Sequence, residues 1–392
     1  MSTGSSKIPY YKVGWFIHKW VLCGGADGCE IVDEAELASD KPPPKPAQPK
    51  TPSAASKPVP KPDAATKMLN DLQKAANAFS RFQAWLDTPD TPKPTTEARD
   101  SQTKEDTVAP FDIQEIPITM RALSLPMGAK LMERWFAGQL NYSPDDQAES
   151  RGLNQNGEPY PPSMIDKTNV TMKWALGFER AKAQYENLVH NVIYSQASLQ
   201  QLAKILQRYP PQTNIDARST QIEDVHTYLQ FERAGVESTW SQKLEQARKR
   251  AVEDRGVPDD LTAALGSFTF YVAIERAFVN ARSATVSEIS VYIKDNYTFT
   301  TDPGSVSQYL GHWSSKGVIV VPPTEGSTLA NRGWANFAVK LGDPKVKGNV
   351  YYPVRNSDFR KWQVKHRRGG DFIIYSNRIV LLLLLRPIKV LW

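Results

Sequence analysis

The stretches GSFTFYVAIERAFVNAR (266–282) and TVSEISVYIKDNYTF (285–299) decide the fold that we predict for this chain. Both are rich in β-branched and aromatic residues, and their polar residues partly alternate with apolar ones, which is typical of β-strands. The C-terminal half is therefore predicted to be rich in antiparallel β-structure. Further strands are predicted at 317–321, 349–354, 371–375 and 378–385.

The segment before these strands has the periodicity of helices. Residues 125–137, LPMGAKLMERWFA, form one predicted helix. Apolar residues at steps of three and four predict further helical structure over 169–209 and over 220–255. A helical part at 111–257 that is followed by a β-rich part at 258–392 predicts an α+β domain in which the two parts pack together.

Residues 1–110 precede this domain and divide into four predicted segments. An aromatic-rich head at 1–40 is too short to bury its own rings, so we expect it to dock on the rest of the chain or on a partner. Residues 41–62, KPPPKPAQPKTPSAASKPVPKP, are predicted to be a flexible Pro/Lys-rich linker with extended, solvated backbone. An amphipathic helix at 63–87 and a polar linker at 88–110 follow. The apolar stripe of the helix packs either on the main domain or on a partner.

Charge and cysteine content restrict the class of protein. The net charge is +6 and the pI is about 9.0, and much of the basic excess lies in the Pro/Lys-rich linker. Charge alone therefore gives little support to nucleic-acid binding. The two cysteines, Cys23 and Cys29, are too few for a disulfide framework. We interpret them as free thiols in a reducing cytosol, with a local bridge as the alternative.

No segment of the sequence has the properties of a secretory leader or of a membrane span. The apolar run at 13–22 is short and is interrupted by His18 and Lys19. The motifs of common NTPases, metalloproteases, lipases and dehydrogenases are also absent from the sequence. We therefore expect a protein that is cytoplasmic in the cell that makes it and that is secreted, if at all, without a classical signal peptide.

The first candidate site follows the second long strand. Asp295 and Tyr297 are predicted to lie on one face of that strand, because side chains alternate along a strand, and Asp302 and His312 follow closely. A carboxylate beside a phenol can bind a metal or a phosphate, and a histidine near an acid can act as a general acid or base. The alternative is that Asp295 pairs with a neighbouring charge and that His312 is a hydrogen-bonded core residue.

A second candidate site is the basic stretch at 358–375, DFRKWQVKHRRGGDFIIY. Arg367 and Arg368, together with the backbone of Gly369 and Gly370, are predicted to hold a phosphate, since guanidinium groups and bare N–H groups both bind it. Interleaved basic and aromatic residues also suit single-stranded nucleic acid. The alternative is a solvated basic loop in which the glycine pair makes a turn.

Two blocks of the chain resemble a known family. PITMRALSLPMGAKLMERWFAG (117–138) and the segments YIKDNYTF, SQYLGHW and YPVRNSDFRKWQVKHRRGGDFIIYS within 292–376 are similar to a proteobacterial family that is often encoded near the spike proteins of type VI secretion systems. The resemblance covers most of 111–392. It implies an antibacterial effector or an accessory cargo protein, with the secretion spike or its tip protein as a partner of 1–110 and a cognate immunity protein as a second partner.

A shorter stretch resembles colicin M-like toxins, which cleave the lipid-linked peptidoglycan precursor. In those toxins a Gly-aromatic strand precedes a strand that ends in Asp-x-Tyr-Asp-Phe, and a His-Arg pair follows. This chain has LGSFTFYVAI, and then Asp295 and Tyr297 at matching positions. Thr298 stands in place of the second Asp and Trp313 in place of the Arg, so this chain has either lost those two functions or uses substitutes such as Asp302 and Arg367.

These observations lead to three functional hypotheses. The first is a type VI secretion effector that hydrolyses a lipid-linked phosphodiester or pyrophosphate in the envelope of a competitor, with the periplasm as the target compartment. In it Asp295 and His312 form the acid–base pair, Tyr297 positions the substrate, and a divalent cation such as Mg²⁺ is a candidate cofactor. The second is a non-enzymatic adaptor or structural cargo that docks on the spike. The third is a nuclease or nucleic-acid binder that uses the basic cluster at 360–368.

Overall fold

The computed structural model describes residues 10–12, 21–23, 29–32, 35–45, 108–237, 259–301, 307–320 and 337–392. The chain divides into two units, of which one combines Met1–Pro46 with Thr107–Trp392 and the other is Ala47–Asp106. The second unit lies outside the described residues. Outside them also lie the predicted helix at 63–87, nearly all of the two predicted linkers, and Asp302.

Two long antiparallel strands form the centre of the larger sheet, β7 (Phe268–Val279) and β8 (Ser283–Tyr297). The outer edge of β7 pairs with β6 (Gln230–Val236) and then with β5 (Thr213–Asp216). The two stretches at 266–282 and 285–299 therefore contain the central strands, and the predicted α+β fold is confirmed.

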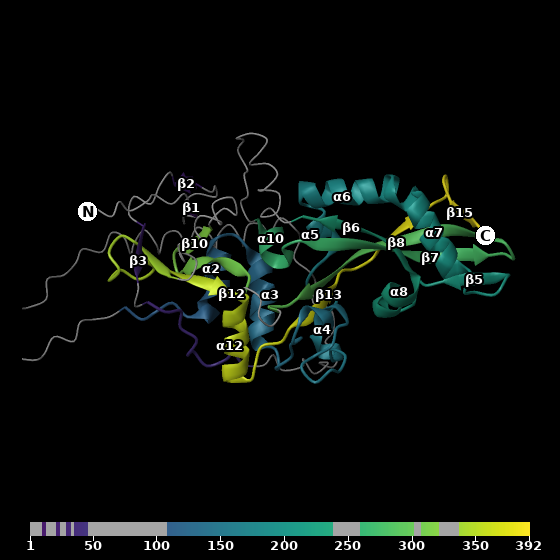
Figure 1. Ribbon diagram of the computed structural model, residues 1–392. Helices are drawn as coiled ribbons and strands as arrows, with labels where there is room; N and C mark the ends of the chain where they lie inside the picture. Colours follow the sequence, from purple (N-terminus) through teal and green to yellow (C-terminus); the bar gives the residue numbers. More distant parts are fainter. Residues whose placement is uncertain are drawn as a thin grey trace, which may run out of the picture. The chain divides into compact units, whose positions relative to one another are not determined.

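The C-terminal segment supplies the other edge of this sheet. Along β8 it forms β13 (Phe372–Tyr375), β14 (Ile379–Leu382) and β15 (Ile388–Leu391), one after another and all antiparallel to β8. A short strand from the helical part, β4 (Ile165–Asp166), adds to β13 in parallel. In Figure 1, β15 and β5 lie at the same end of the large sheet, and the pairing places β8 and β7 between them.

A second sheet has seven strands in the order β2-β1-β10-β9-β12-β11-β3, and neighbouring strands are antiparallel. Three of its strands come from the N-terminal head, and the other four come from the C-terminal half. In chain order they are β1 (Tyr10–Lys12), β2 (Val21–Cys23), β3 (Cys29–Val32), β9 (Tyr309–Ser314), β10 (Gly317–Val320), β11 (Ala338–Leu341) and β12 (Val350–Arg355).

The N-terminal head therefore docks on its own chain, which was one of the two expected alternatives. β1 pairs with β10, and β3 pairs with β11. The connection continues after the strands, because the Asp112 carboxylate accepts hydrogen bonds from the backbone N–H groups of Asp40 and Lys41 at 3.0 and 3.1 Å. The head is part of the main domain rather than a separate docking module.

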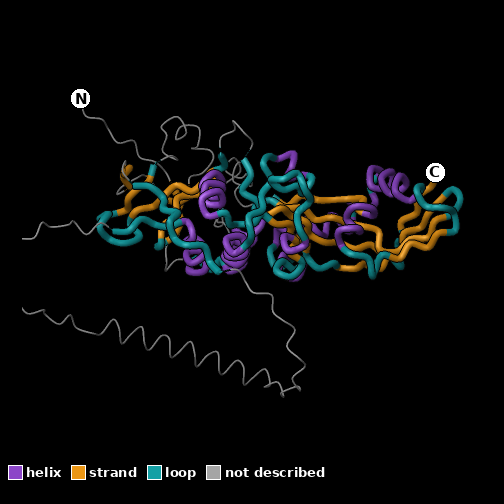
Figure 2. Tube along the Cα trace, turned by 90° about the horizontal axis from the view of Figure 1, so that it is seen from below, coloured by secondary structure: helices purple, strands orange, loops and turns teal. Residues whose placement is uncertain are grey.

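Helices lie on both sides of the large sheet in Figure 1, and Figure 2 shows the strands of the sheet side by side from below. On one face the ring of Tyr185 meets that of Phe270 edge-on at 6.1 Å, and on the other the ring of His226 meets that of Tyr271 at 4.7 Å. Residues 270 and 271 are neighbours on β7, so their side chains point to opposite faces. The helices that carry Tyr185 and His226 are α6 (Glu179–His190) and α8 (Ile222–Leu229), and α7 (Gln196–Leu206) packs against β6 and β15.

A buried aromatic cluster joins the helices α3 (Pro126–Ala137) and α12 (Asn356–His366). Trp135 of α3 meets Phe359 of α12 edge-on, with ring centroids 5.3 Å apart. Phe299, just beyond β8, stacks on Phe359 with an interplanar angle of 4°. Contacts of this kind add to the free energy gained from burial of the rings. The cluster ties the end of the longest strand to both helices.

Three details of the predicted secondary structure are wrong. The periodicity at 169–209 belongs to separate helices, because the chain turns between them and the Ser195 side chain caps the start of α7. The helix predicted at 220–255 is wrong for 230–236, because α8 ends at Leu229 and the next residues form β6 by pairing with β7; residues 238–255 lie outside the described residues. The basic stretch is helical as far as His366, the end of α12, and its glycine pair lies in the short connection to β13. The remaining short helices are η1 (Ile113–Glu115), α2 (Ile116–Ala122), α4 (Asp146–Ser150), η2 (Pro162–Met164), α5 (Met172–Ala175), η3 (Val192–Tyr194) and α10 (Asp260–Leu265).

None of the helices in the described residues combines the length and the apolar character that crossing a bilayer requires.

Candidate functional site

The structure places the sequence-predicted catalytic residues in two different sheets. Asp295 and Tyr297 lie on β8 of the large sheet, whereas His312 lies on β9 of the seven-stranded sheet. Asp302 lies outside the described residues. The closeness of Asp295 and His312 in the sequence therefore gives no support to their proposed acid–base pair.

His312 has the geometry of a buried structural histidine. Its side chain is fully buried, its Nε2 lies 2.9 Å from the Phe337 carbonyl, and its Nδ1 bonds the Tyr309 hydroxyl. A carbonyl only accepts, so Nε2 donates and carries the proton of the neutral ring. Burial lowers the pKa of His312 to about 4, which keeps the ring neutral near pH 7. This geometry matches the structural alternative for His312.

Tyr297 and Asp295 lie on one face of β8, as the sequence alternation predicts. The buried Tyr297 ring stacks on Phe372 at 5.0 Å, and burial raises the pKa of its hydroxyl. Burial also raises the pKa of Asp295 well above its usual value. Tyr297 thus acts as a core ring, and its partners are aromatic.

The predicted phosphate cradle is wrong for Gly369 and Gly370, because both backbone N–H groups already have acceptors. Gly369 donates to the Gly138 carbonyl at 3.1 Å, and Gly370 donates to the Trp135 carbonyl at 3.0 Å. The pair is required by packing instead. Gly369 has a φ of +91°, and a Cβ on Gly370 would lie 2.8 Å from the carbonyl oxygen of Gln139.

The basic side chains around this pair are mostly engaged as well. Arg368 donates to the carbonyls of Ala137 and Gly138 at 2.7 and 3.0 Å, and Lys365 pairs with Asp40 at 2.5 Å. Arg367 is exposed and ends α12 in the left-handed conformation. The cluster at 360–368 is therefore not an open basic surface, which weakens the nucleic-acid hypothesis.

The opposite face of β8 carries a group of polar side chains that the sequence analysis did not identify. Tyr292 and Lys294 point to this face, and their strand partners there are Tyr271 of β7 and Tyr375 of β13. Helix α8 places the His226 ring against all three tyrosine rings, with centroids 4.7, 5.9 and 6.0 Å away. We define the His226 cluster as Glu223, His226, Tyr271, Tyr292, Lys294 and Tyr375.

One hydrogen bond fixes the state of His226. Its Nδ1 lies 2.9 Å from the hydroxyl of the fully buried Tyr292. Burial, with the charge of Lys294 as a second cause, lowers the pKa of His226 to about 4, so the ring is neutral near pH 7. Tyr292 has no other acceptor among the described residues, so it donates to Nδ1. The proton of the imidazole then lies on Nε2, which is a donor.

The other polar groups of the cluster are donors without partners in the described part of the chain. The Lys294 amine has no ion pair there, and burial lowers its pKa. The Tyr375 hydroxyl has no hydrogen bond there, and burial and then the charge of Glu223 raise its pKa. Within the same residues, the Tyr271 hydroxyl is likewise unbonded. Half-buried His226, Tyr271 and Lys294 reach the surface.

Glu223 supplies the acceptor of the cluster. It lies three residues before His226 on α8, a spacing that puts both side chains on one side of the helix. Its Oε1 pairs with Lys167 at 2.6 Å, whereas its Oε2 is buried and has no hydrogen bond among the described residues. Unpaired polar atoms at one place are uncommon in a core and are frequent in functional sites.

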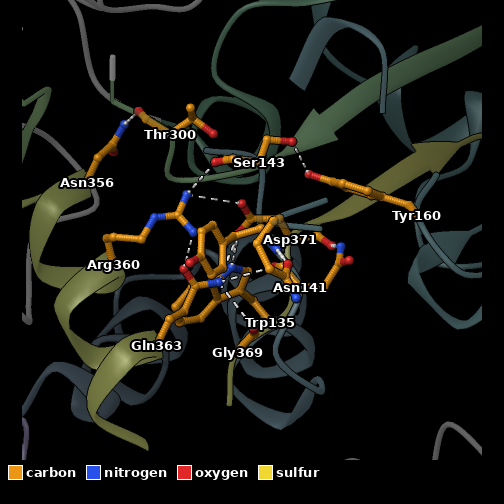
Figure 3. Close-up of polar contacts among 12 residues, drawn as sticks. Trp135, Asn141, Ser143, Tyr160, Thr300, Asn356, Arg360, Gln363, Gly369 and Asp371 are labelled. Carbon is orange, nitrogen blue, oxygen red and sulfur yellow. Dashed lines mark hydrogen bonds and ion pairs between the residues drawn. The ribbon is translucent and has the colours of Figure 1, made fainter. Parts of the chain in front are cut away.

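A second polar cluster, drawn in Figure 3, has a different character. The fully buried Asp371 carboxylate accepts from Trp135 Nε1 at 2.8 Å and from Gln363 Nε2 at 3.3 Å, and its other oxygen lies 3.6 Å from Arg360 Nη2. Burial raises the pKa of Asp371 to about 7. Because the carboxylate is fully buried, a substrate does not reach it.

This Asp371 cluster connects α12 to the chain that follows α3. The Arg360 guanidinium stacks over the Tyr142 ring at 4.1 Å and donates to the Ser143 carbonyl at 3.1 Å. The Ser143 hydroxyl in turn bonds the Tyr160 hydroxyl at 2.8 Å (Figure 3). We interpret the Asp371 cluster as a structural connection, and the His226 cluster as the candidate functional site.

Within the described residues, no group of three or more His, Cys, Asp or Glu side chains is arranged to hold a metal ion. The His226 cluster brings together one imidazole and one carboxylate, and its other members are phenols and an amine. Phenol and ammonium groups are weak ligands for a hard divalent cation, which prefers carboxylate and carbonyl oxygens. The chemistry of the site is therefore best described through its own donors.

Sequence reasoning missed this site for a definable reason. The alternation along 285–299 places Tyr292 and Lys294 on the face of the strand opposite to Asp295. These two members of the site could therefore have been found from the strand pattern. His226 comes from a helix, and 66 residues separate it from its partner Tyr292. No local spacing connects residues that far apart, and only the packing of α8 on the sheet brings them together.

Comparisons with known proteins support a family assignment but no activity. The model of a family of unknown function, DUF6402, matches residues 111–392. Searches of curated proteins and of solved structures found no match.

Proposed function

We propose that this chain, which belongs to the DUF6402 family, is an antibacterial effector that a type VI secretion system delivers. In this proposal the domain at 111–392 hydrolyses a lipid-linked phosphodiester or pyrophosphate in the envelope of a competitor. The resemblances described above suggest the biological setting. The His226 cluster replaces Asp295 and His312 as the proposed reactive centre.

The observation that carries the chemical part is the donor-rich character of the His226 cluster. Nε2–H of His226, the amine of Lys294 and the hydroxyls of Tyr271 and Tyr375 are donors without partners in the described residues. Hydrogen-bond donors and one cation at a half-open surface are suited to an anion, and a phosphate offers several acceptor oxygens. A neutral histidine as donor is an established way to polarise a substrate oxygen.

The proposed reaction is an attack of water on phosphorus. The water oxygen forms a new P–O bond while the P–O bond to the leaving group breaks. The Glu223 carboxylate, whose side chain is 31% exposed, takes a proton from the water, and the ammonium group of Lys294 gives a proton to the leaving oxygen. His226 and the two phenols hold the non-bridging oxygens. Burial lowers the pKa of Lys294, so its ammonium group is a stronger acid than that of an ordinary lysine.

Delivery would depend on the N-terminal region, but not on all of it. Residues of the head pair with β10 and β11 of the main domain, so these strands are occupied within the chain. The separate unit Ala47–Asp106 is thus the better candidate for contact with the secretion spike or its tip protein. A pull-down of spike proteins by the full chain, compared with a chain lacking 47–106, tests this assignment.

Toxicity in a chosen compartment tests the proposed function. The full chain is the correct material, because a fragment of 111–392 lacks the strands that residues 10–32 supply to the second sheet. We expect growth arrest when a Gram-negative host exports the chain to its periplasm, and no arrest when the chain stays in the cytoplasm. Arrest only from the cytoplasm would overturn the envelope target. No arrest from either compartment would favour a non-enzymatic adaptor.

A further inference from the structure

Large apolar side chains are exposed together at one end of the large sheet. Along β14 the side chains alternate, so that Val380 and Leu382 face outward while their neighbours are partly buried. The turn between β14 and β15 adds Leu384 and Leu385, of which 79% and 102% of the surface is exposed. Leu391 of β15 is 81% exposed. We define the leucine edge as Val380, Leu382, Leu384, Leu385 and Leu391.

The sheet registry extends this apolar surface onto the neighbouring strands. Lys389 of β15 pairs with Thr285 of β8, and Thr285 pairs with Phe278 of β7, so the three side chains lie in one row across the sheet. Phe278 is 38% exposed. In Figure 1 the ends of β7 and β15 lie close together at this end of the sheet. Contiguous exposed apolar patches of this kind are uncommon on monomeric proteins and mark interaction surfaces.

The turn that carries the exposed leucines is held in place. The Tyr194 hydroxyl donates to the Arg386 carbonyl at 3.1 Å, and the Arg386 guanidinium lies over the Tyr194 ring at 3.7 Å from its centroid. Leu384 and Leu385 therefore project from a fixed turn. Their exposure is therefore a property of the folded surface. It is unfavourable in free energy, and burial of these side chains against another apolar surface would be favourable.

The charged side chains of β14, β15 and the turn between them are all positive. Residues 378–392, RIVLLLLLRPIKVLW, contain no Asp or Glu. Arg282, Arg386 and Lys389 form no ion pair among the described residues. The nearest carboxylate on the paired strand, that of Glu288, is already bound to Arg276 at 3.1 Å. The edge therefore combines apolar side chains with unneutralised cations.

We propose that the leucine edge docks on the surface of an anionic lipid bilayer. Apolar side chains that enter the acyl boundary, with cations at the level of the headgroups, are the physical pattern of interfacial binding. A second copy of the chain fits less well, because a two-fold contact through this edge would bring Arg386 and Lys389 against the same cations. In this proposal the protein lies on the membrane surface. The proposal does not depend on the reaction assigned to the His226 cluster.

Co-sedimentation of the full chain with vesicles tests this inference. One vesicle contains phosphatidylcholine alone, and the other contains about one third phosphatidylglycerol. We expect binding to the anionic vesicle that weakens as salt rises. The variant Leu384→Ser/Leu385→Ser should lose about tenfold or more in affinity. The variant Arg386→Gln/Lys389→Gln should lose about fivefold per charge on the anionic vesicle only.

The matched control is Val364→Ser, since Val364 is an apolar residue on α12 with 62% of its surface exposed, outside the leucine edge. It should bind vesicles as the unmodified chain does, and circular dichroism should show that all variants fold. Absence of binding to both vesicles would overturn the proposal, as would unchanged binding of the double serine variant. Sedimentation velocity that shows a dimer, dissolved by the same two serines, would assign the edge to a second copy instead.

Discussion

Nδ1 of His226 lies 2.9 Å from the hydroxyl oxygen of Tyr292, a contact that joins helix α8 to the centre of the large sheet. It determines which nitrogen of the imidazole carries the proton. It also leaves the Nε2–H group as the remaining donor of the ring. A structural contact and a chemical property of the site therefore depend on the same hydrogen bond.

Removing the Tyr292 hydroxyl should release the tautomer of His226. In Tyr292→Phe, Nδ1 loses its donor, so the imidazole becomes a mixture of both neutral tautomers. Nitrogen NMR of the histidine ring should show one tautomer in the unmodified chain and a mixture in the variant. We also expect a loss of about 1 kcal/mol in the free energy of unfolding. Tyr228→Phe, an exposed tyrosine on the same helix, should change neither quantity.

Lys294 should be required for toxicity in the periplasm. Lys294→Met removes the charge and the proton donor while it retains the length of the side chain, and we expect growth arrest to be lost. Lys294→Arg keeps the charge but has a pKa too high for proton donation, so only weak activity should remain. Lys204→Met on α7 is the control. Full toxicity of Lys294→Met together with loss in Asp295→Asn would move the reactive centre to the opposite face of β8.

Acid should destabilise the protein through His312. The pKa of His312 falls from an ordinary value of 6.5 to about 4 on folding, so the unfolded chain takes up a proton that the folded chain does not. Its contribution to stability is present above pH 6.5 and is lost as the pH falls toward 4. The full shift corresponds to about 3 kcal/mol. His312→Gln should be less stable at pH 7 and should show a flatter decline between these two pH values.

Folding lowers the pKa of His226 as it does that of His312, so part of the loss of stability in acid remains in the His312→Gln variant. Asp371 titrates in the opposite direction, because its pKa rises from 3.8 to about 7 and its contribution is lost as the pH rises through that window. Urea unfolding of the unmodified chain and the variant across the same pH series isolates the difference. An identical slope in both would contradict the role assigned to His312.

The glycine pair offers a direct comparison between packing and phosphate binding. Gly370→Ala places a Cβ 2.8 Å from a backbone carbonyl and from the Met164 side chain, so we expect a loss of about 2–3 kcal/mol in the free energy of unfolding. Gly235→Ala on β6 is the control, because nothing lies within 4 Å of its added Cβ. A Gly370→Ala chain of normal stability that failed to bind inorganic phosphate would restore the cradle hypothesis.

Arg360 and Asp371 should behave as a coupled pair in a double-mutant cycle. Arg360→Met leaves the buried carboxylate without a cation, and we expect it to cost about 3 kcal/mol. Adding Asp371→Asn should recover much of that loss, because an amide still accepts from Trp135 and carries no charge. Thermal or urea unfolding at pH 8, where the carboxylate is charged, provides the measurement. Strictly additive losses would show that the two side chains do not interact.

Local pattern is a good guide where elements are long and bury both faces. β7 and β8 can be predicted because their β-branched and aromatic residues continue over about a dozen positions or more. For residues 230–236 the sequence predicts helix, because charged residues there continue the helical period of α8. Their pairing with β7 overrides that local preference. The sequence of this segment alone does not show which strand it will pair with.

Functional residues are harder to predict than strands. The alternation correctly predicts that Asp295 and Tyr297 share a face of β8. The carboxylate of Asp295 then led to the prediction that the reactive site lies on that face. The structure shows an aromatic environment around Tyr297 and an opposite face with unpaired donors among the described residues. Whether a polar side chain lacks a partner depends on three-dimensional packing, and a linear sequence does not contain that information directly.

The pairing of the N-terminal strands with the last third of the chain has a consequence for biosynthesis. β3 leaves the ribosome long before β11, so the second sheet cannot close until most of the chain has been made. Contacts of such high sequence separation form slowly. β1 and β2 can pair with each other early, whereas β3 has to wait for β11 before its edge is covered.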